Sequence, residues 1–314
     1  RRGNFLRALR VNRAASRVKG RADGRDLETP SQTYAREVRT TDDGVRLLSF
    51  EPFESVANEF EYAGLKVPRV NQVPSAENAV AYEQAMRTSL RDKPTGAQVE
   101  IKTPEELSQS RLFQTEAGSG FAIKSDGDIV AVYSSDNEPR GGAYALLEAA
   151  VEAGGRKLDA FDTYLPAIYE TVGFRPVSKI AWDDQYAPKA PFAVEDWNKE
   201  NFLEYNNGEP DVVFFVYDPD YTGIDGAVDL PYSKDYDAAA AIQNREVEKM
   251  RERVDEVLGP AKFKRGGSVG IQAIHTPKFF EASQVPIDHG IGTLPKRSGT
   301  ISSDPMESGI LTVN

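Results

Sequence analysis

The chain has 314 residues and a formal net charge of −11, and 39% of its residues are hydrophobic. It contains no cysteine, which excludes disulfide bonds, thiolate metal sites and cysteine nucleophiles. Its two histidines, His275 and His289, leave little material for a zinc site or a serine triad, so we expect no metal. No run approaches the roughly 18 to 20 apolar residues of a membrane span, so we expect a soluble protein.

The charge is distributed very unevenly. Residues 1–25 hold nine basic residues against one acid, Asp23, and this net +8 leaves −19 for the rest of a chain whose total is −11. The segment can form a basic helix with Phe5, Leu6 and Leu9 as nearly its only large apolar side chains. Either it binds nucleic acid or another anionic surface, or it is a solvated arm that packs on a neighbouring subunit.

Three regions are expected along the chain. Residues 1–75 are predicted to be a basic arm and linker, with one possible strand at 45–50 and one possible helix at 53–62 among proline and glycine signals. Residues 76–235 are predicted to form the folded domain. Residues 236–314 are predicted to comprise a charged helix at 238–258, ended by Gly259 and Pro260, and an extended tail that becomes ordered on a partner.

The first half of the domain is predicted to be a helix followed by strands. Ser75 is expected to cap a helix at 76–91, whose apolar stripe contains Ala79, Tyr82, Met86 and Leu90. Strands are expected at 97–102, 111–115, 119–124 and 128–134, with a hairpin turn at 125–128. The last of these strands is apolar on both faces, which is typical of a strand covered on both sides.

The second half is predicted to alternate helices with strands. The expected order is a helix at 142–154, a strand at 157–161, a helix at 165–172 ended by Gly173, a strand at 176–182, a polar loop, and a strongly hydrophobic strand at 211–217. The fold class that we expect is therefore α+β, a mixed sheet flanked by helices, with extended N- and C-terminal arms.

The turn before the helix at 142–154 reads Glu138-Pro139-Arg140-Gly141-Gly142-Ala143. A helix N-terminus presents unpaired N–H groups and a positive dipole to an anion, and small residues there allow close approach. Glu138 is an acid where a phosphate would prefer a cation, and Pro139 removes one N–H donor. Arg140 restores a cation nearby.

Together with the string Ile168-Tyr169-Glu170-Thr171-Val172-Gly173-Phe174, this turn makes residues 76–218 resemble the GNAT family of N-acetyltransferases. In that family a strand splays from its neighbour, and the next helix begins at Gln/Arg-x-x-Gly-x-Gly/Ala, whose backbone holds the pyrophosphate of CoA. Gly141 and Ala143 match the two small positions, whereas Glu138 departs from the pattern.

The resemblance implies acetyl-CoA as a cofactor and suggests a role for several residues. Tyr169 would act as general acid on the departing CoA thiolate, although a buried core tyrosine is an equal alternative. Asp136 and Asp162 are the nearest candidates for a general base, and each is more commonly a strand-end residue. The remaining residues would contact the cofactor along its length: Val132, Ser134, Arg140, Gly141, Gly142 and Ala143.

The fuller pattern also resembles GNAT-like domains within large bacteriophage virion-associated or polyvalent proteins, a context that suits a first residue other than methionine, a basic arm and a long tail. Our preferred hypothesis is therefore a virion-associated structural or interaction protein, found in the virion or the host cytoplasm, with a GNAT-like domain of unsettled or lost activity. Its arms would contact other virion proteins, and residues 1–25 could contact nucleic acid. The alternative is an active N-acetyltransferase that transfers an acetyl group from acetyl-CoA to an amine.

Overall fold

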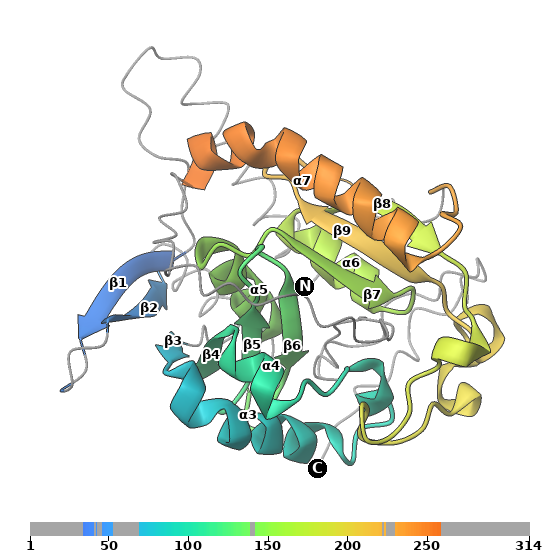
Figure 1. The fold of residues 1–314 in the computed structure, drawn as a ribbon, viewed down its shortest axis with the longest axis horizontal. Helices are drawn as coiled ribbons and strands as arrows, with labels where there is room; N and C mark the ends of the chain where they lie inside the picture. Colours follow the sequence, from blue (N-terminus) through green and yellow to red (C-terminus); the bar gives the residue numbers. More distant parts are fainter. Residues whose placement is uncertain are drawn as a thin grey trace, which may run out of the picture.

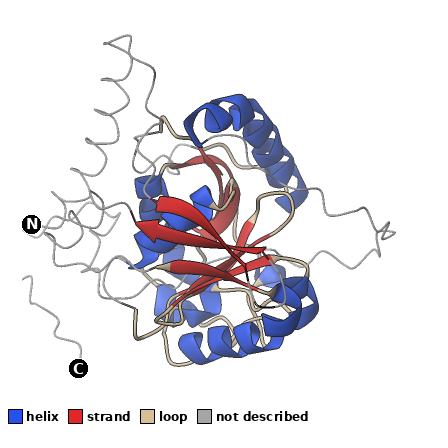
Figure 2. Cartoon of the chain, turned by 90° about the vertical axis from the view of Figure 1, so that its left-hand side faces the viewer, coloured by secondary structure: helices blue, strands red, loops and turns tan. Residues whose placement is uncertain are grey.

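The computed structural model describes residues 34–40, 42, 46–52, 69–138, 142–221, 223 and 230–258. These residues form two β-sheets with helices between and around them, which confirms the α+β class (Figure 1). In place of the one mixed sheet that we expected, the strands form two sheets whose pairs are antiparallel. The strands lie in the middle of the molecule and helices cover them on both sides (Figure 2). The basic arm at 1–25, the helix expected at 53–62 and the tail beyond 258 lie outside the described residues.

The first sheet is antiparallel, with its six strands in sequence order: β1 (Tyr34–Thr40), β2 (Arg46–Pro52), β3 (Val70–Val73), β4 (Arg111–Thr115), β5 (Gly120–Ile123) and β6 (Ile129–Tyr133). One face packs on α3 (Ser75–Leu90) and α4 (Pro104–Ser108), which contribute Tyr82, Met86 and Leu107 to a shared core. The sheet thus includes β1, β2 and β3, which precede the start expected for the folded domain at residue 76, as well as β4, β5 and β6, which follow it. The β1–β2 hairpin projects from the body (Figure 1).

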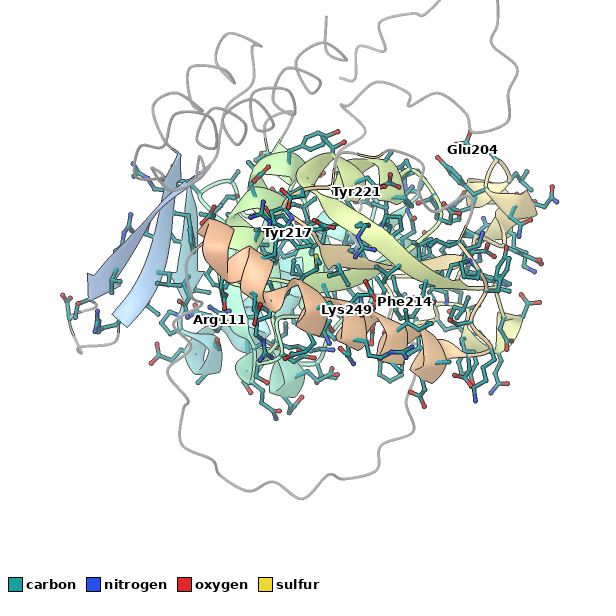
Figure 3. All side chains as sticks on the ribbon, turned by 90° about the horizontal axis from the view of Figure 1, so that it is seen from above. Arg111, Glu204, Phe214, Tyr217, Tyr221 and Lys249 are labelled. Atoms are coloured by element: carbon teal, nitrogen blue, oxygen red, sulfur yellow. The ribbon has the colours of Figure 1, made fainter. Side chains whose placement is uncertain are left out.

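The second sheet has the order β7 (Lys157–Phe161), β9 (Val212–Tyr217), β8 (Phe174–Ile180), and its pairs are antiparallel. Side chains on β9 alternate between two layers, as the pleat of a strand requires. Phe215 lies in the core shared with α5 (Gly142–Glu152) and α6 (Leu165–Val172). Phe214 lies in the core under α7 (Tyr236–Leu258), as Figure 3 shows from above.

Helix α5 is the centre of the fold. Every residue from Gly142 to Val151 is buried, including Glu148, because the helix contacts the first sheet, α6 and the core of the second sheet. A helix that is apolar around its whole circumference is typical of such a position. The alanines at 143, 145, 149 and 150 let its neighbours approach closely.

The two sheets meet where β6 and β7 begin. A single parallel bridge pairs Asp128 with Lys157, and the carbonyl of Gly127 accepts a hydrogen bond from the backbone N–H of Arg156 at 2.7 Å. The Lys157 Nζ lies 2.7 Å from Asp126 Oδ2 and donates to Asn244 Oδ1 on α7 at 2.7 Å. One nearly buried ammonium therefore connects the hairpin turn, β7 and α7.

Most expected elements are confirmed, some with shifted ends. The helix at 165–172 and its left-handed stop at Gly173, with φ 102°, are as predicted, and so is the buried stripe of α3. Ser75 as a cap is wrong: it lies inside α3, and its hydroxyl donates to the Ser110 carbonyl. The strand expected at 97–102 is also wrong, because residues 96–98 form a 3₁₀ turn and α4 follows.

Among the described helices, none combines the length and the apolar composition that crossing a membrane requires.

The contact between the sheets predicts a pH-dependent contribution to stability. Burial raises the pKa of Asp126, but the hydrogen bond and charge of Lys157 outweigh burial, and the pKa lies below its ordinary value. Such a carboxylate stabilises the fold above its unfolded pKa of about 3.9 and ceases to do so as the pH falls through the lower folded value. Asp126→Asn should therefore lower the free energy of unfolding at about pH 7, and the deficit should shrink below about pH 4.

Urea unfolding of both proteins across this pH range measures the difference. Asp92→Asn is the control, because Asp92 is exposed on the surface. A deficit that stays constant down to about pH 3 would contradict the assignment, since it would not follow the charge of Asp126.

Candidate functional site

The candidate site lies where β6 and β7 part. After the bridge at Asp128 and Lys157, no backbone hydrogen bond joins the described residues of β6 to those of β7. Two parallel strands that separate in this way do not pair their facing backbone N–H and C=O groups with each other. We call this parting of the two strands the opening; every residue of both strands is buried.

A β-bulge shapes β6 at this point. Gly120 is paired with Tyr133 and Ala122 with Val130, so Phe121 alone faces two residues of β6. Ala131 has φ 50°, in the left-handed region that costs a residue with a Cβ about 1–3 kcal/mol. Such bulges are common beside active sites because they redirect one strand.

The bulge changes which core each residue of β6 joins. Val130 and Ala131 both lie in the core with α3, whereas Val132 lies in the core with α5. The Tyr82 hydroxyl donates to the Ala131 carbonyl at 3.3 Å, which ties the bulge to α3. Burial beside Tyr133 raises the pKa of Tyr82, and burial raises the pKa of Tyr133 to about 12, so both hydroxyls keep their protons at neutral pH.

The segment 93–98, which follows α3, bridges the far ends of the two strands. The Lys93 Nζ donates to the Ser134 carbonyl at 2.6 Å and lies 3.0 Å from Asp136 Oδ1, just after β6. At the end of β7, Thr163 Oγ1 donates to Gln98 Oε1 at 2.7 Å. We call residues 93–98 the strap, because their side chains hold β6 and β7 across the opening.

Glu138 occupies the approach to the N-terminus of α5. Its side chain is 5% exposed, and its Oε2 accepts a hydrogen bond from Thr115 Oγ1 at 2.7 Å. A Cβ added to Gly142 would lie 2.4 Å from Glu138 Cγ and 2.8 Å from Oε1, so the carboxyl packs directly on the first residue of the helix. Within the described residues Oε1 has no hydrogen-bond partner.

The expected cofactor-binding residues are partly placed by the structure. Val132 and Ser134 are buried at the end of β6, and the Ser134 hydroxyl has no hydrogen-bond partner among the described residues. Gly142 and Ala143 form the first turn of α5 and are buried. Arg140 and Gly141 lie outside the described residues.

The three expected catalytic residues have different surroundings. Tyr169 is fully buried on α6, with its ring 5.6 Å from Phe215 and 6.4 Å from Phe174 between centroids. Asp136 is 81% exposed and paired with Lys93. Asp162 is partly buried after β7, where its backbone N–H donates to the Asp211 carbonyl at 2.7 Å. These residues thus lie in three places: after β6, after β7 and on α6.

Sequence reasoning missed the strap, whose Lys93, Thr95 and Gln98 are ordinary polar residues in a segment without a motif. It found Glu138 as an anomaly of the turn but not that its carboxyl packs on α5. Among the described residues no group of three or more histidine, cysteine or acidic side chains could hold a metal ion. The arrangement offers backbone groups, hydroxyls and carboxylates, which suit binding and proton transfer.

Comparisons with protein-family models, with curated proteins and with solved structures found no match for this chain.

The strap predicts a local change in Lys93→Met. The variant keeps the length of the side chain but loses the ammonium that joins the strap to Ser134 and Asp136. Amide hydrogen exchange in residues 93–98 and 134–136 should become at least tenfold faster. The reason is that local unfolding of these residues no longer has to break the contacts of the ammonium. Exchange measured by mass spectrometry checks this.

Lys249→Met is the control, since it removes an exposed ammonium that pairs with Glu246 within α7. Unchanged exchange of residues 93–98 in Lys93→Met would show that the strap is held by its backbone alone.

Proposed function

We propose that this protein is a virion-associated bacteriophage structural or interaction protein whose described part is a GNAT-like domain that has lost tight binding of acetyl-CoA. The proposal has two parts, a domain of acetyltransferase type and a changed cofactor site. The observation that carries it is the carboxyl of Glu138 against the first turn of α5.

The order of elements supports the GNAT-like domain. From β3 onwards it is strand, two helices, three antiparallel strands, the central helix α5, β7, α6 and two further strands. The parting of β6 from β7 corresponds to the splayed strands of that family, and α5 follows β6 as the pyrophosphate-binding helix would. The bulge of β6 at Ala131 and the Tyr-x-x-x-Gly-Phe sequence at the end of α6 also support it.

Glu138 argues against a working cofactor site. A phosphate at the N-terminus of α5 would need the region that the carboxyl now occupies beside Gly142. Two like charges about 4 Å apart repel by about 4 kcal/mol at an effective dielectric constant of about 20, which corresponds to about a thousandfold in affinity. The helix dipole favours either anion there, so the protein's own carboxylate takes the place of the ligand.

The terminal arms support a role in binding. The basic segment 1–25 and the acidic remainder of the chain are complementary in charge, which favours contact between copies or with other virion proteins, and the arginines also suit nucleic acid. A fold by itself does not fix a function. We therefore assign the activity of the protein to these contacts.

The second candidate is an active N-acetyltransferase, and the presence of Tyr169 in the Tyr-x-x-x-Gly-Phe sequence at the end of α6 favours it. In that case the tyrosine hydroxyl would donate a proton to the CoA thiolate, and Asp136 or Asp162 would accept a proton from the amine. Tyr169→Phe would then abolish most of the transfer, while acetyl-CoA would still bind.

Titration calorimetry with acetyl-CoA tests the second part of the proposal, the changed cofactor site. The unaltered protein should bind no more tightly than about 1 mM. Glu138→Gln should bind at least tenfold more tightly, because the amide keeps the hydrogen bond to Thr115 and removes the repulsive charge. Glutamine is also the residue that the family pattern prefers at this position.

Glu148→Gln is the control, because it removes a buried carboxylate from the same helix two turns further on. Micromolar binding of acetyl-CoA by the unaltered protein would contradict the proposal and favour the transferase. Acetyl transfer that is lost in Tyr169→Phe would establish that the protein is a transferase. If neither the unaltered protein nor Glu138→Gln binds acetyl-CoA, the charge of Glu138 is not the reason why acetyl-CoA binding is lost.

The virion assignment has its own measurement. Mass spectrometry of purified particles should find this chain in a fixed ratio to the other structural proteins, and washing with high salt should release it if charged arms hold it. Its presence only in the soluble fraction of infected cells would contradict the assignment.

A further inference from the structure

A cavity lies beside the end of β7, and among the strap and the expected site residues only Gln98 lines it. Its volume is about 290 Å³, and it lies between the strand end at Phe161, the segment around Gln98 and Glu100, and the connection from β8 to β9. This connection lies at the opposite end of the molecule from the β1–β2 hairpin (Figure 1). The volume is near the lower limit for small-molecule pockets, which suits a ligand with one ring.

Three aromatic side chains give the cavity its apolar character. Phe161 is 1% exposed and lies at its base, whereas Tyr186 and Phe192, on the connection from β8 to β9, are 41% and 47% exposed. Partly exposed rings around a concave site are typical of places where another ring binds, because stacking and burial then act together. The cavity therefore favours a flat apolar group.

The charges around the cavity disfavour an ionised ligand. The carboxylate of Glu100 is paired with the ammonium of Lys102, with 2.8 Å between Nζ and Oε2, and the Lys102 side chain is only 2% exposed. A ligand ammonium at Glu100 would therefore face Lys102. Lys189 also lines the cavity, but it is exposed, and solvent screens its charge toward a ligand of either sign. A ligand carboxylate would face Glu100 itself.

We propose that this cavity is a binding site for a small, uncharged aromatic molecule that carries a hydrogen-bond donor. The ring lies among Phe161, Tyr186 and Phe192, and the donor bonds to the carboxylate of Glu100. The site does not depend on acetyl-CoA, because none of its lining residues belongs to the N-terminal turn of α5.

The chain contains its own reporter of binding. Its only two tryptophans, Trp182 and Trp197, lie with their ring centroids 5.8 Å and 5.0 Å from that of Phe161. A ligand that contacts Phe161 therefore changes the surroundings of both indoles. Tryptophan fluorescence of the full chain can follow the titration.

The test uses three compounds with the same ring and different charge: benzamide, benzylamine and benzoate. Benzamide should give a saturable change in fluorescence with a dissociation constant on the order of 1 mM, as expected for so small a ligand. Benzylamine and benzoate should bind at least tenfold more weakly. Saturation-transfer NMR on each compound gives a second readout that does not require an optical change.

Phe192→Ala should weaken benzamide binding at least fivefold, because it removes one wall of the cavity without touching the buried core. Leu203→Ala is the control, an exposed apolar residue on the same connection that does not line the cavity. The proposal is overturned if neither readout detects benzamide, if a charged compound binds as tightly, or if Phe192→Ala binds like the unaltered protein.

Discussion

The structure depends on how its two sheets are joined, which among the described residues is by a single β-bridge. The bridge between Asp128 and Lys157 brings β6 and β7 side by side, and beyond it the strands separate because α5 and its neighbours fill the space between the sheets. If backbone hydrogen bonds joined β6 and β7 along their whole length, β7 would belong to the first sheet and the two strands would not separate. The ammonium of Lys157 therefore connects the hairpin turn, the second sheet and α7.

The opening is stabilised by contacts that a simple sheet does not need. The bulge at Ala131 carries a left-handed residue, and Tyr82 holds its carbonyl from α3. At the far end the strap supplies Lys93 to β6 and Gln98 to the residue after β7. Strain at the bulge and polar contacts at the strap both maintain a gap between two buried strands, and natural proteins concentrate such strain at functional sites.

The same arrangement gives α5 two roles. Its apolar circumference fills the space between the sheets, and its N-terminus faces the region where an anion could bind. In this chain the anion is the carboxyl of Glu138, held by Thr115. A cavity lined by aromatic side chains also lies at the end of β7, and none of its lining residues belongs to the helix terminus.

The sequence by itself determined the elements with strong local signals. Helix α6 was predictable because Leu165 and Ile168 set its apolar face and Gly173 supplies the left-handed stop. Helix α4 could have been found from Thr103 and Glu106, which form a capping box. The α+β class, the hairpin at 125–128 and the anomaly of Glu138 also followed from local residue types.

Only the tertiary structure decided that Ser75 bonds to Ser110 instead of capping α3, that Lys93 and Gln98 span the opening, and that the Glu138 carboxyl packs on Gly142. These contacts join residues whose partners are chosen by how strands and helices pack, and no local pattern in the chain specifies that packing.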